Sequence, residues 1–171
     1  GDATAARKTA LKAQALEPGF LPATLFAVEL LGAAGKRRRA LHLLEQAWHL
    51  APHPELAVAH RVLFAADNAA DYLPRLENLI ATRPDDIDSR AAHSAALLDA
   101  GQTERAAEIL GTHADDPDAS APIIRLKADI EEKAYGPTAA RPWMERVASA
   151  TEPTWTCNVC SHPHDAWAAH C

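Results

Sequence analysis

Apolar residues recur at three- and four-residue steps along most of the chain. Ala40, Leu41, Leu44, Ala47 and Trp48 form one such stripe. This spacing places apolar side chains on one face of an α-helix, and the alternation of a half-buried strand does not fit it. The same test predicts helices over residues 3–16, 21–34, 36–50, 54–67, 69–82, 86–100, 102–113, 119–135 and 137–150. The buried faces expected in the last two are Ile123, Leu126, Ile130 and Ala134, and Ala140, Trp143, Met144 and Val147.

The predicted helices repeat in pairs. A turn residue recurs every 33 positions, at Gly35, Asn68 and Gly101, and five positions after each stand Ala40, Leu73 and Ala106. Gly and Asn adopt the left-handed backbone conformation at the least steric cost, so they suit a turn between antiparallel helices. Proline cannot continue helical hydrogen bonding, and it marks the end of each second helix. These prolines are Pro18, Pro52, Pro84 and Pro117.

The first helix lacks a partner before it. Ala6, Ala13 and Pro18 correspond to Ala40, Ala47 and Pro52 at a spacing of 34, so residues 1–17 match the second helix of a pair. A stacked repeat buries its apolar face only against neighbouring repeats. The sequence therefore predicts that further protein precedes Gly1.

Composition limits the classes of function. The 171 residues are 48% apolar, which suffices for a globular core, and no apolar run is long enough to span a bilayer. An excess of 23 acidic over 17 basic residues gives a net charge of −6, which argues against a general nucleic-acid-binding face. We therefore expect no nucleic-acid partner.

All three cysteines, Cys157, Cys160 and Cys171, lie in the last fifteen residues. That grouping is unlike a disulfide framework, which distributes cysteines through a small fold. A Cys-x-x-Cys pair supplies two corners of a tetrahedral metal site, and a second pair normally supplies the others. Only Cys171 represents that second pair, so the sequence predicts an incomplete metal-binding ribbon that continues beyond the chain. Unliganded structural thiols and a redox pair are the alternatives.

Histidines could replace the missing fourth ligand. His162, His164 and His170 lie near the cysteines, although short loops often carry such residues without any site. Zinc is the expected metal, and four thiolates would also accept iron. We expect zinc in the intact protein and no stable metal binding by these 171 residues alone. Trp155 and Trp167 are expected to pack around this ribbon.

The repeat resembles a known family. A period near 34 with Gly35, Ala40, Ala47 and Pro52 is similar to the tetratricopeptide repeat, and this likeness covers about residues 1–150. More narrowly, Leu16-Glu-Pro-Gly-Phe-Leu-Pro-Ala, Ala33-Ala-Gly-Lys-Arg-Arg-Arg-Ala, Ala47-Trp-His-Leu-Ala-Pro-His-Pro and the Trp-x-Cys-x-x-Cys tail resemble the C-terminal half of alphaproteobacterial HemY-type proteins.

That resemblance implies a cytoplasmic repeat domain at the bacterial inner membrane, held by an anchor preceding Gly1 and associated with haem biosynthesis. The sequence departs from the family in lacking a complete second Cys-x-x-Cys, and Ser161 stands where such a knuckle usually has Gly. A second family, the lipopolysaccharide-assembly regulators with tetratricopeptide repeats and a rubredoxin-like domain, shares the architecture. Its repeats fit less closely.

No catalytic constellation is present among the motifs tested. The chain has no phosphate-binding loop, no Gly-x-Gly-x-x-Gly and no His-Glu-x-x-His, so we expect that it is not an enzyme. Asp115, Asp116 and Asp118 suit turn and cap roles. The basic run Lys36–Arg39 lies at a predicted helix N-terminus, where cations oppose the helix dipole. A solvated helix face explains the run, and an external anion, such as a membrane headgroup or an acidic partner, is the alternative.

These observations predict an all-α, TPR-like right-handed solenoid of antiparallel helix pairs over residues 1–151, followed by a short, irregular and incomplete zinc-ribbon-like tail over residues 152–171. The expected function is a protein–protein interaction scaffold with a protein or peptide partner on its concave face. The alternative is a metal-centred redox or regulatory module, in which the cysteines sense iron or an oxidant.

Overall fold

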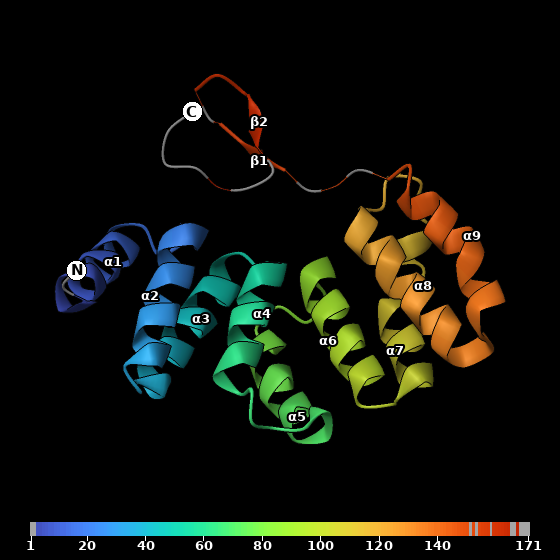
Figure 1. The fold of residues 1–171 in the computed structure, drawn as a ribbon, viewed down its shortest axis with the longest axis horizontal. Coiled ribbons are helices and arrows are strands. Elements are labelled where there is room, and N and C mark those ends of the chain that lie inside the picture. Colours follow the sequence, from blue (N-terminus) through green and yellow to red (C-terminus); the bar gives the residue numbers. More distant parts are fainter. Residues whose placement is uncertain (1–2, 151, 153, 158, 165–166, 168–171) are drawn as a thin grey trace. The chain divides into compact units, whose positions relative to one another are not determined.

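The computed structural model describes residues 3–150, 152, 154–157, 159–164 and 167. Within these residues the chain is mostly helical, with nine α-helices, one 3-10 turn and one antiparallel pair of two-residue strands (Figure 1). The predicted all-α class is confirmed. Part of the tail, which we expected to be irregular, forms a small hairpin.

The helices are named in chain order. Their bounds are α1 Ala3–Leu16, α2 Leu21–Ala33, α3 Arg37–Leu50, α4 Pro54–Leu63, α5 Ala69–Ile80, α6 Ile87–Asp99, α7 Thr103–Leu110, α8 Ala121–Tyr135 and α9 Pro137–Val147. The 3-10 turn η1 is His113–Asp115, and the strands are β1 Trp155–Thr156 and β2 Pro163–His164.

Several predicted helices end earlier than expected, and the causes are clear for α4 and α7. Helix α4 ends at Leu63 instead of residue 67, because the Arg61 guanidinium donates to the carbonyls of Phe64, at 2.5 Å, and Asp67, at 3.0 Å, and so fixes a non-helical turn. Helix α7 ends at Leu110, and Gly111 follows with a φ of 58° that breaks the helix. The chain then continues into η1.

The repeated turn residues behave in two ways. Gly35 and Gly101 have φ values of 68° and 75°, as the repeat predicts. The expectation for Asn68 is wrong, since its φ is −69° and its side chain instead caps α5 by accepting from the Asp71 amide at 2.9 Å. An N-cap oxygen satisfies an otherwise unpaired amide at the start of the helix, which favours this extended conformation.

The residues that follow these turns are buried, and they bring paired helices together. Ala40 and Ala106 are fully buried and Leu73 is 6% exposed. Each of the four repeated prolines follows the end of an α-helix or of η1, as expected.

The chain divides into two compact units, residues 1–102 and residues 103–171. In the first unit, α2 packs against α1, α3 and α4, and α5 packs against α3, α4 and α6. Trp48 of α3 is fully buried and donates its indole N–H to the Ser89 hydroxyl of α6 at 3.0 Å. This bond satisfies the one polar atom of the largest side chain in that core.

In the second unit, α8 packs against α7, η1 and α9. Its buried residues are Ala121, Ile123, Ile124, Ala128 and Ile130. The expectation that Ala134 is buried is wrong, because residues 132–135 at the end of α8 are all exposed. Met144 of α9 is 48% exposed, so its expected burial is also wrong, and Trp143 is half-buried between the cations of Lys127 and Arg146.

None of the helices in the described part of the chain is long and apolar enough to span a bilayer.

Candidate functional site

A groove of about 870 Å³ lies between α2 and α4 in the first unit. Both helices line it with the same periodicity, through residues 25, 28, 29, 32 and 33 of α2 and residues 55, 58, 59, 62 and 63 of α4. These positions form one stripe on each helix, and most of them are apolar. We call this feature the α2–α4 groove.

The groove combines a packed floor with exposed apolar walls. Val28 is 2% exposed, whereas Val58 and Val62 of α4 are 63% and 67% exposed. At one end α2 and α4 approach closely: a Cβ added to Gly32 would lie only 3.0 Å from the Leu63 side chain. Valines exposed on neighbouring turns of one helix form a contiguous apolar surface. Such a surface is less common than a single exposed apolar residue and is typical of a binding site.

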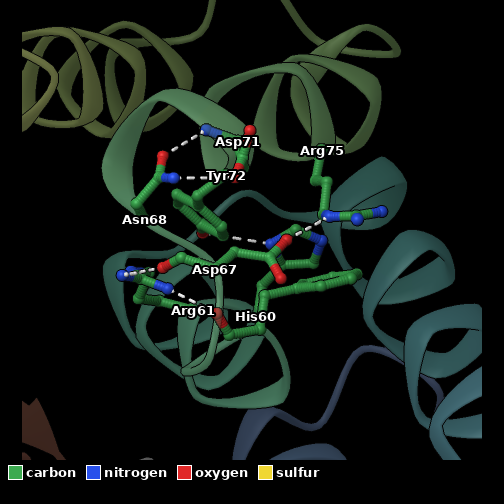
Figure 2. A network of polar contacts seen from close by, with 8 residues as sticks. His60, Arg61, Asp67, Asn68, Asp71, Tyr72 and Arg75 are labelled. Atoms are coloured by element: carbon green, nitrogen blue, oxygen red, sulfur yellow. Dashed lines mark hydrogen bonds and ion pairs between the residues drawn. The ribbon is translucent and has the colours of Figure 1, made fainter.

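The opposite face of α4 is anchored in the core. Leu56, His60 and Phe64 are 1%, 4% and 5% exposed. The His60 Nδ1 and the Tyr72 hydroxyl form a hydrogen bond of 3.0 Å between α4 and α5 (Figure 2). The His60 ring centroid lies 5.0 Å from that of Phe64 and 5.6 Å from that of Tyr72, so the three rings pack as one cluster.

Arginines surround this aromatic cluster. Arg75 and Arg37 approach the Phe64 ring, with guanidinium carbons 4.6 and 5.1 Å from its centroid, and Arg61 lies 4.7 Å from the centroid of Tyr72. Arg75 also pairs with the Asp67 carboxylate at 2.5 Å (Figure 2). Cations over aromatic faces add to the packing, so the turn between α4 and α5 is held by both apolar and polar contacts.

Burial favours the neutral forms of His60 and Tyr72. Desolvation, with a smaller contribution from the Arg75 charge, lowers the pKa of His60 to about 4. Desolvation raises the pKa of Tyr72 to about 12, against an opposing effect of Arg61. At neutral pH the pair is therefore an uncharged hydrogen-bonded contact inside the core. His60 therefore contributes to packing.

Four consecutive cations lie beside one end of the groove. Lys36, Arg37, Arg38 and Arg39, which we call the basic cluster, are all exposed, and Arg37 also lines the α2–α4 groove. Helix α3 begins here with no capping side chain and no acidic residue in its first turn. Positive charges at a helix N-terminus oppose the helix dipole, so the basic cluster does not stabilise α3.

The Cys-rich tail contains a short hairpin. Strands β1 and β2 pair antiparallel, the Cys157 amide donates to the His162 carbonyl at 3.0 Å, and the Ser161 amide donates to the Cys157 carbonyl at 2.9 Å. Ser161 has a φ of 58°, the left-handed conformation that Gly adopts more readily. A serine therefore occupies the position where the resemblance led us to expect Gly.

The hairpin carries two of the cysteines predicted as metal ligands. Cys157 is half-buried and Cys160 exposed, and the rings of His162 and His164 meet edge to face at 5.0 Å between centroids. Two thiols on one turn fit half of a tetrahedral zinc set. Cys171 and His170 lie outside the described residues. Within the described part of the chain, no group of three potential ligands gathers at one place.

The other sequence candidates have local roles. Trp155 is half-buried in β1, and Trp167 is 44% exposed. Asp116 accepts from the Asp118 amide at 2.8 Å, the turn role expected for the acidic cluster. Sequence reasoning missed the α2–α4 groove. Its signal was the identical spacing of the lining positions in residues 25–33 and 55–63, most of which are apolar.

Known proteins include one that is similar over this whole chain. The probable magnetosome protein Mms48 of Magnetospirillum gryphiswaldense is 31% identical over 175 residues, an alignment that takes in 100% of this chain and 38% of that protein. The chain thus spans little more than a third of the length of the relative. No protein-family model matches the chain, and no solved structure matches it.

The His60–Tyr72 contact predicts a pH dependence of stability. The pKa of His60 is about 4 in the fold and near 6.5 when unfolded. The stabilisation from neutral His60 is therefore complete above pH 6.5 and is lost as the pH falls toward 4, and it amounts to at most about 3 kcal/mol of the free energy of unfolding. The free energy of unfolding of His60→Asn should fall less between pH 6.5 and 4.5 than that of the wild type, as measured by urea unfolding followed by circular dichroism.

The exposed His42 provides the control for that comparison. His42→Asn should follow the wild-type pH profile, since that side chain is already solvated. A His60→Asn profile as steep as the wild type would contradict the buried neutral histidine.

Proposed function

We propose that the helical repeats form a TPR-like right-handed solenoid that acts as a scaffold, and that it binds a protein or peptide partner in the α2–α4 groove. Gly35 and Gly101, two 33-residue periods apart, both have positive φ and are each followed five positions later by a buried alanine, which supports the repeat. On this proposal the protein works by recognition and not by catalysis.

The exposed valine pair is the observation that carries the proposal. Val58 and Val62 stand on successive turns beside the small residues of α2, within a groove of about 870 Å³. Apolar grooves between helices accept an amphipathic helix or an apolar peptide through side chains at three- and four-residue steps.

Two cellular settings follow from likeness to other proteins. The resemblance to HemY-type proteins suggests partners in haem biosynthesis at the bacterial inner membrane, with the repeats on the cytoplasmic side. The Mms48 relative, named as a probable magnetosome protein, suggests partners at the magnetosome. Replacing the native protein in its host with a variant that cannot bind in the groove distinguishes the two. Porphyrin intermediates should accumulate if the partners belong to haem biosynthesis, and magnetosomes should be altered if the partners are magnetosome proteins.

The hairpin favours a second candidate, a metal-centred regulatory module. Ser161 holds the left-handed conformation directly after Cys160, and the Cys157 amide closes the turn onto His162. That backbone presents both cysteines from one turn, as a thiolate metal site requires. In this candidate the cysteines hold zinc or iron and respond to metal or oxidant, and the repeats localise the response.

The scaffold proposal predicts that groove substitutions abolish peptide binding. Peptides are first selected from a random library on the wild-type protein, and their affinities are measured by fluorescence anisotropy. Val58→Asp and Val62→Asp should weaken binding at least about ten-fold, because each places a carboxylate where apolar side chains must be desolvated. Both positions are more than 60% exposed, so stability should change by less than about 0.5 kcal/mol.

Leu50→Asp is the matched control, since Leu50 is 52% exposed and does not line the groove. It should bind the selected peptides as the wild type does. Peptides that bind the valine variants with unchanged affinity, or a library that yields no binder, would contradict the scaffold proposal.

The metal candidate predicts one equivalent of zinc or iron in the protein expressed from its native gene. Cys157→Ser with Cys160→Ser should remove that metal, because two of the thiolates are lost, and Ser161→Gly should retain it, because Gly adopts the same backbone conformation. Elemental analysis of the purified proteins measures both. A wild-type protein with neither zinc nor iron, or a double variant that retains the metal, would refute this candidate.

A further inference from the structure

We propose that the partner of the α2–α4 groove is a peptide segment with an apolar face and acidic residues at one end, and that these carboxylates contact the basic cluster. This inference rests on the proposed scaffold function. It adds the chemistry and the orientation of the segment.

The basic cluster is not neutralised by the fold. Lys36, Arg37, Arg38 and Arg39 are exposed, and none of them lies within 4.0 Å of a carboxylate oxygen in the described part of the chain. Arg37 lies over the face of the Phe64 ring. This contact positions the guanidinium group but does not neutralise its positive charge. Four adjacent unbalanced cations in a protein of net charge −6 attract an external anion.

Neighbouring arginines are already occupied. Arg61 donates to the carbonyls of Phe64 and Asp67, and Arg75 pairs with the Asp67 carboxylate. These contacts use their guanidinium groups to fix the turn after α4 (Figure 2). The cations left for a partner are therefore those of the basic cluster.

The charges give the groove a direction. Arg37, Gly32 and Leu63 line the end where α2 and α4 both finish, whereas Glu55 lines the groove at the first turn of α4. Eight residues of helix separate Glu55 from Leu63, or about 12 Å. A segment of two helical turns spans that length, so its acidic end would lie at the basic cluster and a neutral or basic end would lie at Glu55.

A peptide fits these features better than an anionic membrane surface does. The apolar contact surface lies inside a groove between two helices, and Glu29 and Glu55 on its walls would repel anionic headgroups. A narrow segment instead fills the apolar groove and meets the cations at one end only. The complementary charges would then fix its direction and exclude segments with a basic residue at that end.

The test uses peptides selected on the wild-type protein whose binding requires Val58. These should be enriched in Asp and Glu at one end relative to the starting library. Synthetic versions with those residues replaced by Asn and Gln should bind about three- to ten-fold more weakly at roughly 50 mM salt, and the difference should shrink near 0.5 M salt. Fluorescence anisotropy measures both affinities.

Protein variants locate the effect. Arg38→Gln with Arg39→Gln should lower the affinity for the acidic peptides by a similar factor and leave the affinity for their neutral versions unchanged. Both arginines are exposed, and only Arg37 of the cluster is recorded over the Phe64 ring. Lys8→Gln with Lys12→Gln changes the net charge equally at exposed sites on α1, and it should have no effect.

The outcomes separate the two proposals. If Val58→Asp abolishes binding but acidic and neutral peptides bind alike, the scaffold stands and the acidic partner is refuted. If Val58→Asp has no effect, the groove itself is refuted. If the arginine double variant loses binding to vesicles of phosphatidylcholine and phosphatidylglycerol while peptide affinities stay unchanged, the basic cluster contacts lipid and the acidic-peptide proposal is overturned.

Discussion

The candidate site depends on how α4 is anchored. Leu56, His60 and Phe64 recur every four residues and are buried, and the His60–Tyr72 hydrogen bond fixes that face against α5. Successive residues of an α-helix are about 100° apart, so a position two residues further along points almost to the opposite side. Val58 and Val62 are thereby directed out of the core. The packing that stabilises the repeat also creates the exposed apolar wall.

Much of the helical fold follows from local chemistry. The predicted range 3–16 coincides with α1, and Gly35 and Gly101, two 33-residue periods apart, take the positive φ that the repeat predicts. Asn68 shows the limit of that argument, since its side chain caps α5 and an extended backbone then suits it better than the left-handed turn. The early end of α4 depends on Arg61 reaching the carbonyl of Asp67, a contact that apolar periodicity does not reveal.

The site was harder to infer than the fold. Val58 and Val62 have the residue type and spacing of core positions. Their exposure follows from the tertiary arrangement, which the sequence pattern does not reveal. The cysteines gave the strongest sequence signal, yet Cys171 lies outside the described residues and the hairpin supplies only part of a tetrahedral set. Motif spacing thus indicated a metal, while the groove emerged from the three-dimensional packing of ordinary aliphatic residues.

The central claim is that a partner binds between α2 and α4. Methyl NMR spectra of the isotope-labelled protein, recorded while a library-selected peptide is added, test it most directly. The account predicts that the largest shift changes occur at Val28, Val58, Val62 and Leu63, with little change at Leu110 and Ile124 in the core of the second unit. Changes concentrated on the second unit, with the groove methyls unaffected, would contradict it.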